Sequence, residues 1–131
     1  MDELFKVFNM GSHPLNLAWR FLLELLALGS MGYWGWTQHD GVVRWLWMIG
    51  LPVVAAVLWG TFAVPNDPSR SGQAPIPTPG MIRLGLELLI FAAAVILLRV
   101  SQQPVVSNVL AVMVLIHYAL SYDRIIWLLK N

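Results

Sequence analysis

Two stretches of this chain are too long and too apolar for the interior of a small soluble protein. One runs for 22 residues from Trp45 to Asn66 and the other for 23 residues from Val100 to Tyr122, and neither contains a charged residue. Twenty helical residues span about 30 Å, which is the thickness of the hydrocarbon core of a bilayer. Each stretch therefore predicts a helix that crosses a membrane.

The composition of the whole chain is also that of a membrane protein. Hydrophobic residues make up 58% of the 131 residues and charged residues 11%, whereas an ordinary globular domain has about 45–50% and about 25%. The formal net charge is +1 without a basic run, so we expect no nucleic acid among the partners. The absence of cysteine excludes disulfides, thiolate metal sites and a cysteine nucleophile.

The apolar segments and the turn residues between them predict one all-α domain, residues 1–131, that forms an integral membrane four-helix bundle. We expect its helices at about residues 14–34, 43–64, 81–100 and 105–129. Residues 65–80 contain five prolines and two glycines, so we expect a long loop there with neither helix nor strand. This loop divides the bundle into two helical hairpins.

Four spans place both termini on the same side of the membrane. Six basic residues belong to that side, namely Lys6, Arg20, Arg70, Arg83, Arg124 and Lys130, against Arg44 and Arg99 on the other. The excess of Lys and Arg on cytoplasmic segments predicts that both termini are cytoplasmic. The acidic start of the chain lacks the basic region of a secretory signal. We therefore expect a multi-pass protein of the bacterial cytoplasmic (inner) membrane.

Two Arg/Glu pairs interrupt the apolar segments, and they repeat. Arg20 and Glu24 lie one helical turn apart in the first segment, and Arg83 and Glu87 lie 63 residues further on with the same spacing. Residues i and i+4 share a helix face, so each pair points in one direction as a unit. Because two spans separate the copies, their helices cross the membrane in the same direction.

The helical rise brings polar residues of all four helices to the cytoplasmic half of the membrane. There, three positive and three negative side chains balance: Arg20, Arg83 and Arg124 against Glu24, Glu87 and Asp123. Ionisable residues inside a membrane mark functional sites by default. The candidates for ligand binding or proton relay are Asn16, Arg20, Glu24, Trp59, Thr61, Arg83, Glu87, His117, Tyr122, Asp123 and Arg124.

These residues favour a protein that binds or transports a small polar or anionic ligand, or protons. The alternative is a structural or partner-binding membrane protein whose ion pairs only fix the packing of the helices. In either case we expect membrane lipids and further copies of the chain, in a homo-oligomer, as partners.

Enzymatic activity is the less favoured interpretation, and no catalytic residue is predicted. His117, Ser121 and Asp123 cannot form a triad on one helix, because Ser121 lies four residues from His117 but Asp123 lies six. Di-iron bundles need a Glu-x-x-His motif, which the chain lacks. We therefore predict no metal site and no cofactor.

Four motifs in the chain resemble the YrdB-like family of small bacterial membrane proteins of uncharacterised function. They are Leu15-Asn-Leu-Ala-Trp-Arg20-Phe-Leu-Leu-Glu24-Leu, Leu58-Trp-Gly-Thr-Phe62, Arg83-Leu-Gly-Leu-Glu87-Leu and His117-Tyr-Ala-Leu-Ser-Tyr-Asp-Arg124. The resemblance covers about residues 14–130. It implies four membrane spans, but it brings no substrate or cofactor.

Overall fold

The structure, a computed structural model, describes residues 13–131, and this part of the chain is all-helical apart from one pair of very short strands. The helices are α2 (Pro14–Thr37), α3 (Gly41–Thr61), α4 (Gly80–Val100), α5 (Pro104–Leu120) and α6 (Tyr122–Lys130). The strands are β1 (Phe62–Ala63) and β2 (Ile76–Pro77). The all-α prediction is therefore confirmed.

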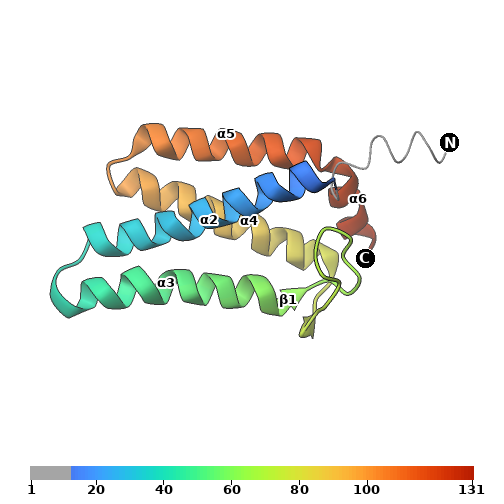
Figure 1. Cartoon of the computed structure of the whole chain (residues 1–131), viewed down its shortest axis with the longest axis horizontal. Helices are drawn as coiled ribbons and strands as arrows, with labels where there is room; N and C mark the ends of the chain where they lie inside the picture. Colours follow the sequence, from blue (N-terminus) through green and yellow to red (C-terminus); the bar gives the residue numbers. More distant parts are fainter. Residues whose placement is uncertain (1–12) are drawn as a thin grey trace.

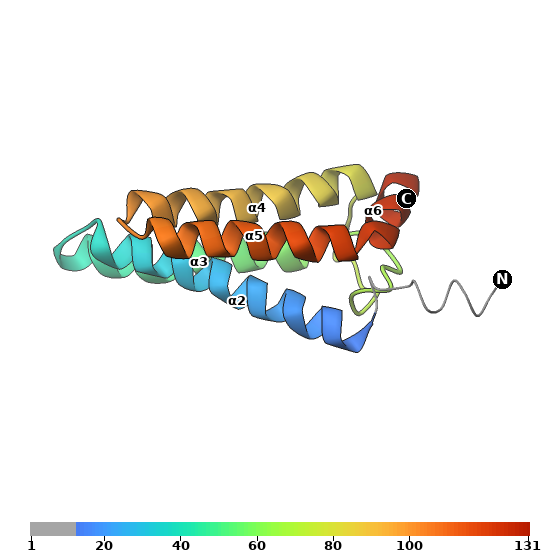
Figure 2. The ribbon, with the colours of Figure 1, turned by 90° about the horizontal axis from the view of Figure 1, so that it is seen from above.

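The four long helices α2, α3, α4 and α5 lie side by side, and α6 lies across one end of them (Figures 1 and 2). The start of α2, the loop after β1 and the C-terminus are at that same end, whereas the turns after α2 and α4 are at the other (Figure 1). Prolines begin two of the helices, Pro14 in α2 and Pro104 in α5. Proline is tolerated there because an N–H in the first turn has no acceptor within the helix.

The last predicted helix, residues 105–129, is two helices in the structure. The N–H of Ser121 still donates to the carbonyl of His117 at 2.9 Å, but the N–H groups of Arg124 and Ile125 both turn to the carbonyl of Ser121. The axes of α5 and α6 therefore meet at 69°. The apolar pattern does not show this break, because apolar residues continue on both sides of it.

The prediction that residues 65–80 contain no strand is wrong for Ile76 and Pro77. These two residues pair in parallel with Phe62 and Ala63, directly after α3. Pro77 is tolerated because a proline need not donate at the edge of a sheet. The N–H of Thr78 supplies a bond to the carbonyl of Ala63 at 2.9 Å instead. The long loop is thereby closed at its base.

A glycine at the start of α4 allows the backbone of α6 to pack directly against it. A Cβ built on Gly80 would lie 1.7 Å from the carbonyl oxygen of Leu128, which no side chain could tolerate. Leu128 is itself fully buried. Close approach of the two backbones, which only glycine permits, therefore fixes α6 against α4 and with it the position of Arg124.

The buried core lies between the long helices and is built from aliphatic and aromatic side chains: Leu23, Ala27, Met31, Ala55, Trp59, Ile90, Phe91, Ala94, Leu98, Leu110, Val114 and Tyr118. Large apolar side chains also point outward along each long helix, and Phe21, Leu46, Leu89 and Leu115 are 60–70% exposed. Within residues 13–131, α3 and α4 are each long and apolar enough to cross a membrane, and α5 with α6 makes a third span if the bent pair is counted as one.

Candidate functional site

The centre of the polar cluster is the carboxylate of Glu87, which is fully buried on α4. Its Oε2 accepts hydrogen bonds from Arg20 Nη2 at 2.8 Å, Arg83 Nε at 2.8 Å and Arg124 Nη2 at 2.9 Å. Its Oε1 accepts from Arg124 Nη1 and from the hydroxyl of Tyr118, both at 2.8 Å. One carboxylate therefore joins α2, α4, α5 and α6.

The two repeated pairs meet at this carboxylate. In both copies the Arg Nε faces its own Glu, at 3.3 Å for Arg20 and Glu24 and at 2.8 Å for Arg83 and Glu87. Arg20 also reaches across to Glu87, so the two copies are linked directly. They differ in burial, because Glu87 is fully buried whereas the side chain of Glu24 is 22% exposed.

The loop after β1 supplies further partners to the arginines of the cluster. Asp67 is 2% exposed and its Oδ2 accepts from Arg124 Nη2 at 2.7 Å. Its Oδ1 accepts from the N–H of Ser69 at 2.9 Å and from the Ser69 hydroxyl at 2.8 Å. The oxygen of Ser69 in turn accepts from Arg20 Nη1 and from Arg124 Nε. A loop turn thus holds two of the arginines that hold Glu87.

The charges of the cluster determine how Asp67 titrates. Burial alone would raise the pKa of Asp67, but the hydrogen bond and positive charge of Arg124, with the two hydrogen bonds from Ser69, lower it below its ordinary value. Asp67 is therefore a carboxylate at neutral pH, and its charge is part of what neutralises Arg124.

Trp59 of α3 lies against two of the arginines. The centre of its ring is 5.1 Å from Arg83 Cζ and 5.7 Å from Arg20 Cζ, which is within the range of a cation–π contact. Its carbonyl also accepts a hydrogen bond from Arg83 Nη1. Among the described residues, two buried side-chain nitrogens have no hydrogen-bond partner, and these are Trp59 Nε1 and Arg83 Nη2.

The edge of the cluster is open, and there Glu24 faces Arg70 of the loop. The nearest oxygen and nitrogen of this ion pair are 4.0 Å apart, and the side chain of Arg70 is 23% exposed. Burial and the like charges of Arg83 and Arg20 lower the pKa of Arg70, against the opposing effect of Glu24. Arg70 is thus a cation that lies close to two others, Arg83 and Arg20.

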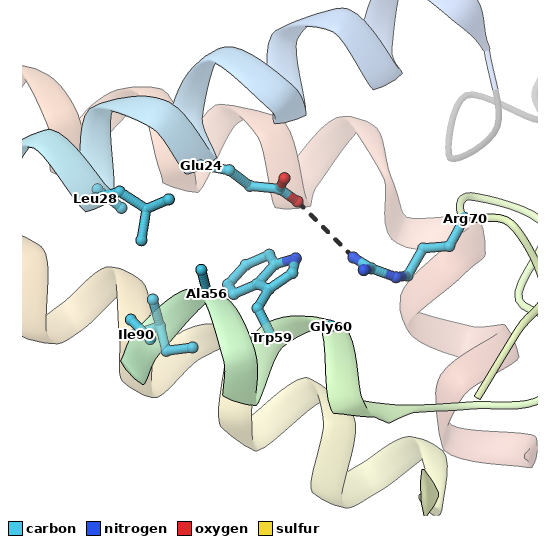
Figure 3. A pocket seen from close by; sticks show the side chains of 9 residues that line it. Glu24, Leu28, Ala56, Trp59, Gly60, Arg70 and Ile90 are labelled. Atoms are coloured by element: carbon cyan, nitrogen blue, oxygen red, sulfur yellow. Dashed lines mark ion pairs between the residues drawn. The ribbon is translucent and has the colours of Figure 1, made fainter. Parts of the chain in front are cut away.

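Two cavities adjoin this ion pair. An outer, open pocket of about 330 Å³ is lined by Leu17, Arg20, Phe21, Glu24, Ser69, Arg70 and Ser71. An inner cavity of about 180 Å³ is lined mostly by apolar residues of α2, α3 and α4, and Glu24 and Arg70 belong to its lining as well. Figure 3 shows the inner cavity with the ion pair at its rim. The Glu24–Arg70 pair is therefore shared by the two spaces.

The structure brings some of the predicted site residues into a second, smaller network. Asn16 Nδ2 donates to the hydroxyl of Ser121 at 2.7 Å, and Asn16 Oδ1 lies 3.1 Å from His117 Nδ1. All three side chains are buried. This network ties the start of α2 to the break between α5 and α6.

Other predicted residues are not among the hydrogen-bond partners of the Glu87 carboxylate described above. Tyr122 is 52% exposed, and Asp123 is half-buried in the first turn of α6. Thr61 is half-buried at the C-terminal end of α3. The bend at Ser121 explains the first two positions, because it turns Arg124 and Leu128 inward and so leaves Tyr122 on the outer face of α6. The tyrosine that donates a hydrogen bond to Glu87 is Tyr118 of α5.

Four residues of the site are absent from the sequence prediction: Asp67, Ser69, Arg70 and Tyr118. A signal for two of them exists in Asp67-Pro68-Ser69, since Asp and Ser beside Pro favour a turn closed by side-chain hydrogen bonds. Nothing local shows that this turn folds back onto the arginines. In the described part of the chain, no group of three or more His, Asp or Glu side chains is arranged to hold a metal ion.

Comparison with known proteins supplies a family but no activity. The family described as "Protein of unknown function (DUF2568)" matches residues 18–115. The "Uncharacterized protein YrdB" of Bacillus subtilis (strain 168) is 45% identical over 116 residues, which covers 88% of this chain and 94% of that protein. No solved structure matches the chain. The similarity to YrdB confirms the resemblance that the four motifs indicated.

Proposed function

We propose that this chain, which belongs to the family described as "Protein of unknown function (DUF2568)", is a four-span membrane protein that binds a small anion beside Arg70. The apolar side chains exposed along the long helices support the membrane location, because only lipid would cover them without cost. In this proposal α2 is also a span. Its Arg20 and Glu24 turn toward Glu87 and Arg70 rather than toward lipid.

The distribution of basic residues supports an orientation with the cluster in the cytoplasmic half of a bacterial inner membrane. The end of the molecule that carries the cluster holds Arg20, Arg70, Arg83, Arg124 and Lys130, whereas the other end holds Arg44 and Arg99. Lys and Arg are retained on the cytoplasmic side. The anion would then enter from the cytoplasm.

The observation that carries the proposal is the excess of positive charge at the open edge. The lining of the open pocket there holds two arginines, Arg20 and Arg70, and one carboxylate, Glu24. The open pocket that adjoins this cluster presents the guanidinium groups of Arg20 and Arg70 and the hydroxyls of Ser69 and Ser71. The guanidinium group of Arg70 and the hydroxyl of Ser71 can donate hydrogen bonds to an anion, whereas the Ser69 hydroxyl already donates to Asp67.

The closed centre of the cluster favours anion binding over proton relay. Glu87 already accepts five hydrogen bonds, four of them from guanidinium groups. A carboxylate held in this way is stabilised in its charged form. We therefore assign Glu87 the role of positioning the arginines, and we assign the binding of the ligand to the edge around Arg70.

The test is a titration of the full chain, reconstituted in lipid nanodiscs, with acetate, phosphate and the cation choline. We expect the two anions to bind and choline not to bind. Arg70→Gln should weaken anion binding about tenfold or more, because a hydrogen bond to a charged group is lost. Arg44→Gln, at the other end of the molecule, is the matched control and should leave binding unchanged.

A purely structural role is the second candidate. The observation that favours it is that the Glu87 carboxylate already accepts five hydrogen bonds from within the protein. In that case neither anion would bind to the wild-type chain, and Arg70→Gln would change only the stability of the fold. An anion that binds equally to the wild-type, Arg70→Gln and Arg44→Gln chains would also contradict the proposed site.

A further inference from the structure

The inner cavity has the composition of a site for a hydrocarbon group rather than for water. Its volume is about 180 Å³, and its walls are Ala27 and Leu28 of α2, Ala55, Ala56 and Gly60 of α3, and Ile90 of α4, with Trp59 beside them. Apolar cavities of this size stay dry and accept small apolar molecules, as an engineered cavity of about 150 Å³ accepts benzene.

One polar group of this cavity has no protein partner. Trp59 is 8% exposed, it lines the cavity, and its Nε1 makes no hydrogen bond within the described residues. In Figure 3 the nitrogen edge of the indole faces the space between Glu24 and Arg70. A buried N–H without an acceptor costs roughly 1–3 kcal/mol. An acceptor oxygen supplied by a ligand would remove this cost.

The ion pair at the rim is the loosest contact of the cluster. Glu24 and Arg70 are 4.0 Å apart, against 2.7–2.8 Å for the pairs that Asp67 and Glu87 make with Arg124. The Glu24 carboxylate also has Arg20 as a second partner at 3.3 Å. Glu24 can therefore release Arg70 to another carboxylate without becoming unpaired.

We propose that the ligand is a monocarboxylate with one compact apolar group, which it inserts into the inner cavity while its carboxylate binds Arg70 and accepts a hydrogen bond from Trp59 Nε1. This inference rests on the proposed anion site and assigns a ligand class to it. The single excess positive charge of the open pocket's lining, Arg20 and Arg70 against Glu24, matches a monoanion. The cavity volume matches a group of about six to eight carbon atoms.

The first experiment compares carboxylates of different apolar size in the nanodisc-reconstituted chain. Benzoate should bind on the order of 30-fold more tightly than acetate, because its ring leaves water. Benzyl alcohol, which has the ring but no charge, should bind more weakly than benzoate. Laurate tests a carboxylate that arrives through the lipid phase, and its chain is too long for the cavity. Tighter binding of laurate than of benzoate would overturn the proposal that the apolar group of the ligand is compact.

The second experiment fills the cavity with a side chain. A Cβ on Gly60 would meet no atom within 4 Å, so Gly60→Leu can extend into the free space without a backbone clash. We expect Gly60→Leu to reduce the affinity for benzoate at least tenfold and to leave the affinity for acetate unchanged. Gly50→Leu is the matched control, because Gly50 lies on the same helix, is equally unobstructed and does not line the cavity.

The third measurement follows the Trp59 N–H itself in the wild-type chain and does not depend on filling the cavity. The indole ¹H–¹⁵N resonance of Trp59, assigned by its loss in Trp59→Phe, should move downfield when benzoate binds. A resonance that does not move would overturn the assigned hydrogen bond.

These experiments separate the failure of this inference from the failure of the proposed function. If acetate and benzoate bind with the same affinity and Gly60→Leu affects neither, the anion site stands but the apolar subsite is wrong. If no carboxylate binds at all, both are wrong.

Discussion

The same substitution made in the two repeats should have very different consequences. Glu87 is fully buried, accepts five hydrogen bonds and pairs with three arginines. Glu87→Gln keeps the size of the side chain but removes the charge, and it turns an NH₂ group toward guanidinium donors. Breaking a buried ion pair by removing one partner costs about 3–5 kcal/mol. We expect a loss of this size or larger for Glu87→Gln.

Glu24→Gln changes a carboxylate that is 22% exposed and whose contacts are 3.3 and 4.0 Å long. Partly exposed pairs of this kind contribute about 1 kcal/mol or less. The assay is thermal unfolding of the purified chain in detergent, followed by the loss of helical circular dichroism. Glu87→Gln should lower the Tm by roughly 10 °C or more and Glu24→Gln by only a few degrees. Equal losses in the two variants would refute the assignment of Glu87 as the centre of the cluster.

Three further predictions concern the elements around the cluster. Gly80→Ala should displace α6, because the new Cβ would lie 1.7 Å from the carbonyl oxygen of Leu128. Limited proteolysis should then cut the C-terminal segment faster than in the wild type. An unchanged cleavage rate would contradict the close packing of α6 against Gly80. Burial raises the pKa of Asp67, but Arg124 and Ser69 lower it by more, so the pKa is lower in the folded chain than in the unfolded chain. The carboxylate therefore stabilises the fold above its unfolded pKa, and this contribution is lost as the pH falls through the folded value. Asp67→Asn should reduce the Tm at neutral pH and make the Tm fall less steeply as the pH is lowered, and a fall identical to that of the wild type would count against the Asp67–Arg124 pair. Asn16→Leu should cost about 1–3 kcal/mol by thermal unfolding, because it leaves two buried hydrogen-bond partners unsatisfied, and a variant as stable as the wild type would show that this network is dispensable.

The sequence predicts well what depends on local pattern. Apolar runs with turn residues between them place α2, α3 and α4 within a few residues of their observed bounds. The i,i+4 spacing predicts that each repeated Arg faces its own Glu, as it does in both copies. The helix predicted at residues 105–129 is instead two helices, because the break at Ser121 is made by tertiary contacts. Gly80 seats α6, and Arg124 is drawn to Glu87.

The partners within the cluster depend on distant parts of the chain and could not be predicted in the same way. Asp67 pairs with Arg124 from a position 57 residues earlier in the sequence. The Pro-rich composition of its loop indicates turns but not which surface the loop covers. The balance of three positive and three negative helix residues was therefore an incomplete prediction, because it left out the two loop charges, Asp67 and Arg70.

The affinity of acetate for the Glu24→Gln chain tests the central claim most directly. Glu24 is the partner of Arg70 that an incoming anion must replace. Removal of its charge should strengthen acetate binding by about threefold to tenfold, although it slightly weakens the fold. Isothermal titration of the wild-type and Glu24→Gln chains in nanodiscs gives both affinities. Tighter binding by the variant is the predicted result, and equal or weaker binding would contradict an anion site at Arg70.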